Sequence, residues 1–87
     1  MKIELRVKYI DGKAEDADAI FIDFIAFERE RKKSVVQFDR NLTLTDLAWL
    51  AWHSVKRNSK TDLAFDPAWL ATVEMVEVRD EVQPDPS

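Results

Sequence analysis

Cysteine is absent from this sequence of 87 residues, and glycine occurs only once. The absence of cysteine excludes disulfide bonds, thiolate nucleophiles and thiolate metal sites, and it is typical of proteins from a reducing compartment. The single glycine excludes a glycine-rich loop that binds phosphate. The longest apolar stretch, residues 19–27, is interrupted by Asp23 and is too short for a membrane-spanning helix. The alternation of charged and apolar residues at the N-terminus is also unlike a signal peptide.

Positively charged residues are also fewer than negatively charged ones. The chain has 13 Lys and Arg residues against 17 Asp and Glu residues, which gives a net charge of -4. A protein that binds nucleic acid needs a basic face to displace counterions from phosphate. The basic cluster at residues 29–33 lies at the end of a predicted helix, where the helix dipole favours positive charge. We therefore expect no nucleic acid and no membrane among the partners.

Hydrophobic periodicity predicts an α+β fold that is mainly α. Residues 2–10 alternate apolar and charged side chains, which is typical of a half-buried strand, and Asp11-Gly12 predicts a tight turn after it. Apolar residues then recur at helical spacing in three segments, at about 18–33, 44–57 and 67–78. The predicted fold is therefore an N-terminal strand or short hairpin followed by three helices.

The starts of these helices carry capping signals. Asp16 or Asp18 can cap the first helix, and Thr43 with Asp46 resembles a capping box at the start of the second. Asp66-Pro67 offers a capping side chain followed by a proline at the first position of the third helix. These signals agree with the helical periodicity that follows each of them.

A chain of 87 residues is long enough for one domain. We place this domain at residues 1–78, because the segment after Val78 is acidic, contains two prolines and has no periodic apolar face. Residues 79–87 are therefore predicted to form a disordered tail, and residues 34–41 to connect the first two helices.

His53 is the only histidine and the first residue to consider for catalysis or metal binding. A catalytic role would need a nucleophile or an orienting carboxylate within reach, and a zinc site would need further ligands. Asp16, Asp18 and Asp23 resemble part of a calcium loop, but its glycine and terminal Glu are absent at the required spacing. We expect no enzyme activity, no metal site and no cofactor, and we place His53 at the edge of the core or on a contact surface.

Large aromatic rings are abundant for so small a domain, with three Trp and five Phe residues. The predicted helix at 44–57 is apolar over much of its circumference. Its leucine and alanine residues lie on one side, and Trp49 and Trp52 extend the apolar surface beyond that side. Such a helix is either central in the core or in contact with a partner, and the sequence leaves both alternatives open. The candidate protein-binding residues are Trp49, Trp52, His53, Phe65 and Trp69.

Four features in this order resemble the tail assembly chaperones of siphovirus-type, long-tailed bacteriophages. They are the N-terminal strand that ends in Asp11-Gly12, the segment DFIAFER at 23–29, the segment LAWLAWH at 47–53, and the segment FDPAWL at 65–70. The segment at 47–53 is the most specific of them. The resemblance covers residues 3–78.

The resemblance implies a virus-encoded protein that is made in the host bacterial cytoplasm and is not part of the mature virion. Proteins of this family bind the tape measure protein, keep it soluble and help to recruit the major tail protein during tail morphogenesis. The aromatic helices also suit self-association into a homo-oligomer.

Two alternatives stay open from the sequence. One is a small structural or connector protein of the phage, whose aromatic helices pack into an oligomeric ring; finished particles would contain such a protein but not an assembly chaperone. The other is a host regulator that binds nucleic acid through residues 29–33.

Overall fold

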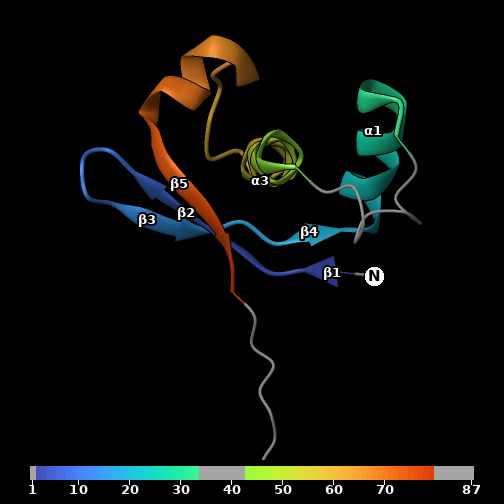
Figure 1. Ribbon diagram of the computed structural model, residues 1–87, viewed down its shortest axis with the longest axis horizontal. Coiled ribbons are helices and arrows are strands. Elements are labelled where there is room, and N and C mark those ends of the chain that lie inside the picture. The colour runs from blue at the N-terminus through green and yellow to red at the C-terminus, as the bar shows by residue number, and fades with distance from the viewer. Residues whose placement is uncertain (1, 34–42, 80–87) are drawn as a thin grey trace, which may run out of the picture.

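The computed structural model describes residues 2–33 and 43–79. Its centre is a three-stranded antiparallel sheet with the strand order β3-β2-β5. One long helix, α3, lies across this sheet, and a shorter helix, α1, lies beside α3 on the side away from the turns that precede β5 (Figure 1). The sheet strands are β2 (Leu5–Tyr9), β3 (Ala14–Asp16) and β5 (Val73–Val78), and the helices are α1 (Phe21–Arg31) and α3 (Leu44–Arg57).

The alternation predicted for the N-terminal strand is present in β2. Leu5 and Val7 are fully buried, whereas Arg6 between them is exposed. Gly12 has a φ of +96° in the turn that follows, a conformation that glycine adopts without strain. Strand β3 then pairs antiparallel with β2, so that of the two alternatives, a single strand or a short hairpin, the hairpin is formed. The predicted strand is nevertheless interrupted at Glu4, and its first two residues form β1 (Lys2–Ile3), which pairs with β4 (Ala19–Ile20).

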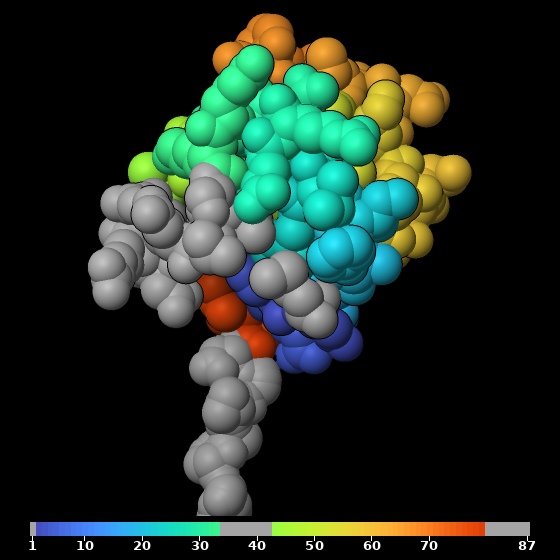
Figure 2. Space-filling view, turned by 90° about the vertical axis from the view of Figure 1, so that its right-hand side faces the viewer, coloured from blue at the N-terminus to red at the C-terminus, as the bar shows by residue number. Residues whose placement is uncertain are grey.

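The second predicted helix coincides with α3. The Thr43 hydroxyl accepts a hydrogen bond of 3.1 Å from the Asp46 N–H, and the Asp46 carboxylate accepts one of 3.2 Å from the Thr43 N–H. These two bonds form the predicted capping box and fix where the helix begins. Residues on several sides of α3 are buried, because the sheet lies on one side of it and α1 on another (Figure 1). Seen from the side of α1, the middle of α3 is covered and its two ends show on either side (Figure 2).

The predicted mainly α fold, with three helices after an N-terminal strand or short hairpin, is wrong. Residues 67–78 do not form a helix: a short π-helical turn η2 (Phe65–Trp69) and a 3₁₀ turn η3 (Leu70–Thr72) lead into strand β5. Val76 of β5 lies opposite Val7 of β2, and both side chains are buried against the core. The β-branched residues of this segment therefore pack on a partner strand rather than around a helix.

The first predicted helix begins three residues later than expected. Ala19 and Ile20 belong to β4, and the N-cap of α1 is Ile20 rather than Asp16 or Asp18. Asp23, at the third helical position, accepts a hydrogen bond of 2.8 Å from the Ile20 N–H and so satisfies one of the unpaired donors at this end of the helix. The two predicted caps were therefore wrong.

Two predictions about the chain's organisation fall partly or wholly outside the described residues. The connector at 34–41 lies outside them, and so does the predicted tail except for Arg79. The Arg79 N–H donates to the Glu4 carbonyl over 2.8 Å, so that this residue continues the pairing of β5.

In the two described ranges, no helix has both the length and the apolar character needed to cross a membrane.

Candidate protein-binding site

The five candidate residues lie in one cluster of aromatic rings that runs through the domain from α1 to β2. Trp49, Trp52 and His53 come from α3, and Phe65 and Trp69 come from η2. The ring centroids of successive neighbours lie 5.6–6.4 Å apart, in the order Phe27, Trp49, Trp52, Phe65, Trp69, Tyr9. Such separations are typical of rings in edge-to-face or stacked contact. The structure therefore brings together residues from two separate segments of the sequence, 49–53 and 65–69.

Two members of the cluster belong to the hydrophobic core. Trp49 is 6% exposed and Trp69 is 1% exposed. Trp69 is enclosed by the Tyr9 ring at 6.4 Å and the Phe65 ring at 6.3 Å, while Trp49 contacts the Phe27 ring of α1 at 6.0 Å. These two tryptophans join the helices and the sheet, and neither presents its ring to solvent.

The other three members, Trp52, His53 and Phe65, are half-buried and form what we call the aromatic strip. The Trp52 ring lies 5.6 Å from the Phe65 ring and 6.3 Å from the His53 ring. The Trp52 Nε1–H donates to the Leu63 carbonyl over 2.9 Å, and the Lys56 ammonium lies 5.7 Å from the centre of the Trp52 ring. These contacts hold the strip in one arrangement while part of each ring stays accessible.

A buried carboxylate fixes the histidine of the strip. His53 Nδ1 lies 2.6 Å from Asp23 Oδ1, and the His53 ring stacks on Trp49 with centroids 5.1 Å apart. An ionised carboxylate is only an acceptor, so Nδ1 carries the proton in this bond. This orienting carboxylate could not be predicted from the sequence near His53, because Asp23 lies 30 residues earlier in the chain. The one available signal was a single acid inside the apolar stretch 19–27, where a charge must be paired if it is buried.

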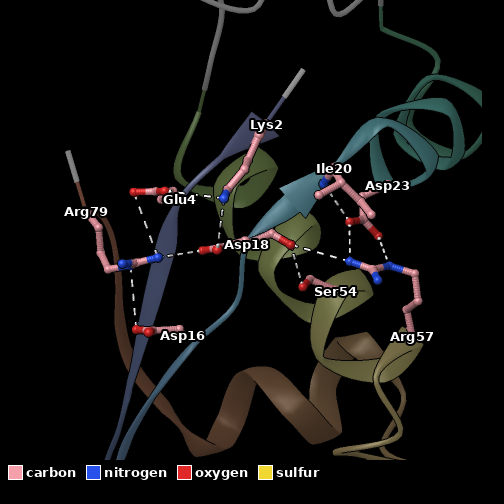
Figure 3. Close-up of polar contacts among 9 residues, drawn as sticks. All are labelled: Lys2, Glu4, Asp16, Asp18, Ile20, Asp23, Ser54, Arg57 and Arg79. Carbon is pink, nitrogen blue, oxygen red and sulfur yellow. Dashed lines mark hydrogen bonds and ion pairs between the residues drawn. The ribbon is translucent and has the colours of Figure 1, made fainter. Parts of the chain in front are cut away.

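The Asp23 carboxylate accepts hydrogen bonds from several donors (Figure 3). Its side chain is 0% exposed, and besides Ile20 N–H and His53 it accepts bonds from Arg57 Nε at 3.0 Å and Arg57 Nη2 at 2.9 Å. Burial by itself raises the pKa of Asp23, but the bonds from Arg57, Ile20 and His53 outweigh it and hold the pKa below the ordinary carboxyl value. This carboxylate therefore stays ionised and fastens α1 to α3.

A second polar cluster lies next to Asp23 (Figure 3). The Asp18 carbonyl accepts a bond of 2.7 Å from the Ser54 hydroxyl, and the Asp18 carboxylate lies 2.8 Å from Arg79 Nη2. Arg79 also lies 3.6 Å from Asp16 and 3.9 Å from Glu4. The acids that resembled a calcium loop are thus separated: Asp16 and Asp18 hold the end of β5, whereas Asp23 holds α3.

Asp46 plays a corresponding role at the other end of the two helices. It is almost fully buried, its carboxylate lies 2.9 Å from Lys33 Nζ, and Arg31 Nη2 lies 3.6 Å away. Burial raises the pKa of Asp46, but the bonds from Lys33 and Thr43 outweigh this and lower it. Within residues 2–33 and 43–79, no group of three or more His, Cys, Asp or Glu side chains is arranged to hold a metal ion.

We expect acid to destabilise the fold as these two carboxylates are protonated. The folded-state pKa values of Asp23 and Asp46 lie below 3.8, so their contacts stabilise the protein at neutral pH and are lost as the pH falls through those values. Urea unfolding at several values between about pH 6 and about pH 2 checks this. The Asp46→Asn variant should lose less stability than the parent below about pH 4. An equal loss of stability in the variant and the parent would contradict the stabilising role assigned to the Asp46 carboxylate.

Comparison with known proteins adds no relative. No protein-family model, curated protein or solved structure matches this chain.

Proposed function

We propose that this chain is a protein-binding module without catalytic activity, and that the aromatic strip contacts its partner. The observation that carries this proposal is the contact between the half-exposed rings of Trp52 and Phe65, at 5.6 Å, next to the exposed side chain of Leu63. Aromatic side chains in such positions are the residues that most often dominate binding energy at interfaces. The hydrogen bond from Trp52 to Leu63 lowers the entropy that binding would otherwise cost.

We further propose that the partner is the tape measure protein of a long-tailed phage. The resemblance of residues 3–78 to tail assembly chaperones supports this identity, and the resemblance also implies recruitment of the major tail protein. A long helical client offers a stripe of apolar residues that an aromatic surface can cover. The net charge of -4 would help to keep such a complex in solution. On this proposal the protein acts in the host cytoplasm and leaves before the particle is complete.

Replacing Trp52 with alanine should weaken binding of the tape measure protein about thirtyfold, the effect of losing about 2 kcal/mol at an interface hot spot. The dissociation constant is measured by calorimetry with purified tape measure protein or a soluble fragment of it. Circular dichroism checks that the variant keeps the fold of the parent.

Two further variants make this experiment decisive. Leu63→Ser removes an exposed apolar side chain next to Trp52 and should also weaken binding, with little effect on stability because the side chain is not in the core. Phe21→Ser removes a more exposed apolar side chain from α1, outside the strip, and should leave the dissociation constant unchanged. Unchanged binding by folded Trp52→Ala and Leu63→Ser variants would refute the proposed surface.

A further inference from the structure

Strand β5 forms one edge of the sheet. The strand order β3-β2-β5 places β2 on one side of β5, and no strand of residues 2–33 or 43–79 pairs with its other side. The opposite edge of the sheet, β3, has only three residues, and its side chains are mostly exposed and polar. Strand β5 has six residues, of which four are apolar. It is the better edge of the two for accepting a further strand.

The hydrogen-bond pattern shows which backbone groups of β5 point away from β2. The Arg79 N–H donates to the Glu4 carbonyl over 2.8 Å, and Leu5 lies opposite Val78. In an antiparallel strand, the backbone N–H and C=O groups of successive residues point alternately toward and away from a given neighbouring strand. The N–H and C=O groups of Val76 and Val78 therefore point outward. None of them has a backbone partner among the described residues.

An apolar groove lies directly beside this edge. It has a volume of about 250 Å³ and separates β5 and η3 from the first turns of α3. Leu44, at the start of α3, is 74% exposed, and Met75 on β5 is also exposed. The groove is lined by Leu44, Ala48, Leu70, Val73, Glu74, Met75 and Val76. Side chains of an added strand that point to the α3 side would enter it, because successive side chains of a strand alternate between its faces.

Charge defines the partner of this edge more closely. Glu74 is the only charged residue that lines the groove, and it has no ion pair within the described ranges. The other acid of β5, Glu77, is already paired with Lys8 at 3.2 Å. The register shift between Lys8 and Tyr9 leaves Glu74 without an opposite residue on β2, which places its charge at the edge. A basic side chain is the complement of this position.

A second copy of the chain does not supply that complement. Its own β5 contains Glu74 and Glu77 but no Lys or Arg, so a pair of β5 strands would place no basic side chain of either strand beside Glu74. An extended segment of another protein with apolar residues on one face and a Lys or Arg on the same face suits both the groove and Glu74.

We propose that the outer edge of β5 binds an extended segment of a partner protein by β-strand addition, with apolar side chains in the groove and a basic side chain beside Glu74. In this binding mode, backbone hydrogen bonds supply affinity and the alternate side chains supply specificity. The surface does not include the aromatic strip, so this inference goes beyond the proposed function and does not depend on it.

Amide hydrogen exchange of the full chain, followed by NMR, tests the proposal. The probe is the acetylated peptide Ser-Val-Thr-Val-Thr-Lys-Thr, in which both Val residues and the Lys lie on one face of a strand. At about ten times the peptide's dissociation constant, exchange of the Val76 and Val78 amides should slow about tenfold. The Met75 and Glu77 amides, which point toward β2, should already exchange slowly without peptide.

Matched variants test the two sources of specificity. Glu74→Lys should weaken binding of the Lys peptide about threefold, as expected for the loss of an exposed ion pair. The same variant should strengthen binding of a peptide with Glu in place of Lys by a similar factor. Leu44→Ser should weaken binding of both peptides, because it removes an apolar side chain that lines the groove. Ile22→Ser removes an exposed apolar side chain from α1, on the other side of α3, and should change neither.

Three results would overturn the proposal. The first is slow exchange of the Val76 and Val78 amides without peptide, which would mean that another part of the chain or a second copy already covers the edge. The second is peptide-induced change at the Trp52 side chain instead of β5. The third is the absence of any change at about 1 mM peptide, since weaker binding would not be a specific site.

Discussion

The Asp23→Ala variant is expected to unfold with a free energy about 3 kcal/mol lower than that of the parent protein. Removing the carboxylate leaves the Arg57 and His53 side chains and the Ile20 N–H without their acceptor. Breaking a buried ion pair typically costs about 3–5 kcal/mol. We expect the lower end of this range, because the Arg57 and His53 side chains are 27% and 25% exposed and regain some water contact. The melting temperature should fall by about 12–24 °C.

Urea and thermal unfolding followed by circular dichroism measure this loss. Asp62→Ala is the matched control, because Asp62 is exposed and makes no ion pair within the described residues; its effect should stay within about 0.5 kcal/mol. The double variant Asp23→Ala/Arg57→Met should recover part of the loss, because it removes the charge that Asp23→Ala leaves unpaired. A loss no larger than that of Asp62→Ala would contradict the role assigned to the carboxylate.

The position of this ion pair explains how the domain can expose aromatic rings without losing its shape. Asp23 is on α1, whereas Arg57 and His53 are on α3, so the pair fixes the end of α3 from which the strip begins. The Trp49 ring then stacks on His53 and contacts Trp52. A charged contact inside the domain therefore positions aromatic side chains at its surface.

The elements that could be predicted from the sequence depend on local signals. The capping box of Thr43 and Asp46 involves residues three apart, and α3 begins where it predicts. The turn at Gly12 likewise depends on a single residue with a positive φ. Signals of this kind are complete within a few residues, so the sequence alone contains them.

The segment that became β5 was wrongly predicted because its structure depends on a distant partner. Val73 and Val76 are three residues apart, a spacing that fits a helix when read alone. In the fold, Val76 lies opposite Val7, which is 69 residues earlier (76 minus 7). Tertiary pairing decided between two structures that the local pattern allowed.

The same limit applies to the candidate site. The sequence identified the aromatic residues that meet in the cluster, but not which of them are exposed. Trp49 and Trp52 are three residues apart on one helix, yet the first is buried by Phe27 of α1 and the second stays half-exposed against Phe65. Those neighbours come from elements that lie before and after α3, so only the assembled fold separates the two roles.

The largest effect is expected for Trp69→Ala. The Trp69 side chain is 1% exposed and contacts the rings of Tyr9 and Phe65, so its removal leaves a large cavity between the sheet and η2. Replacing a buried tryptophan with alanine costs about 3–5 kcal/mol. The total stability of a domain of 87 residues is about 4–13 kcal/mol, so this loss removes a large share of it. Thermal unfolding of Trp69→Ala and the milder Trp69→Phe measures the loss.

The comparison with Trp52→Ala separates a core role from a binding role. Trp69→Ala should lose binding of the tape measure protein only to the extent that it unfolds, and a stabilising osmolyte such as trimethylamine N-oxide should restore both its fold and its binding. The osmolyte should not restore binding by Trp52→Ala, because that variant is already folded and lacks part of the contact surface. Rescue of the Trp69→Ala fold without rescue of binding would mean that the Trp69 ring contacts the partner directly, which its burial argues against.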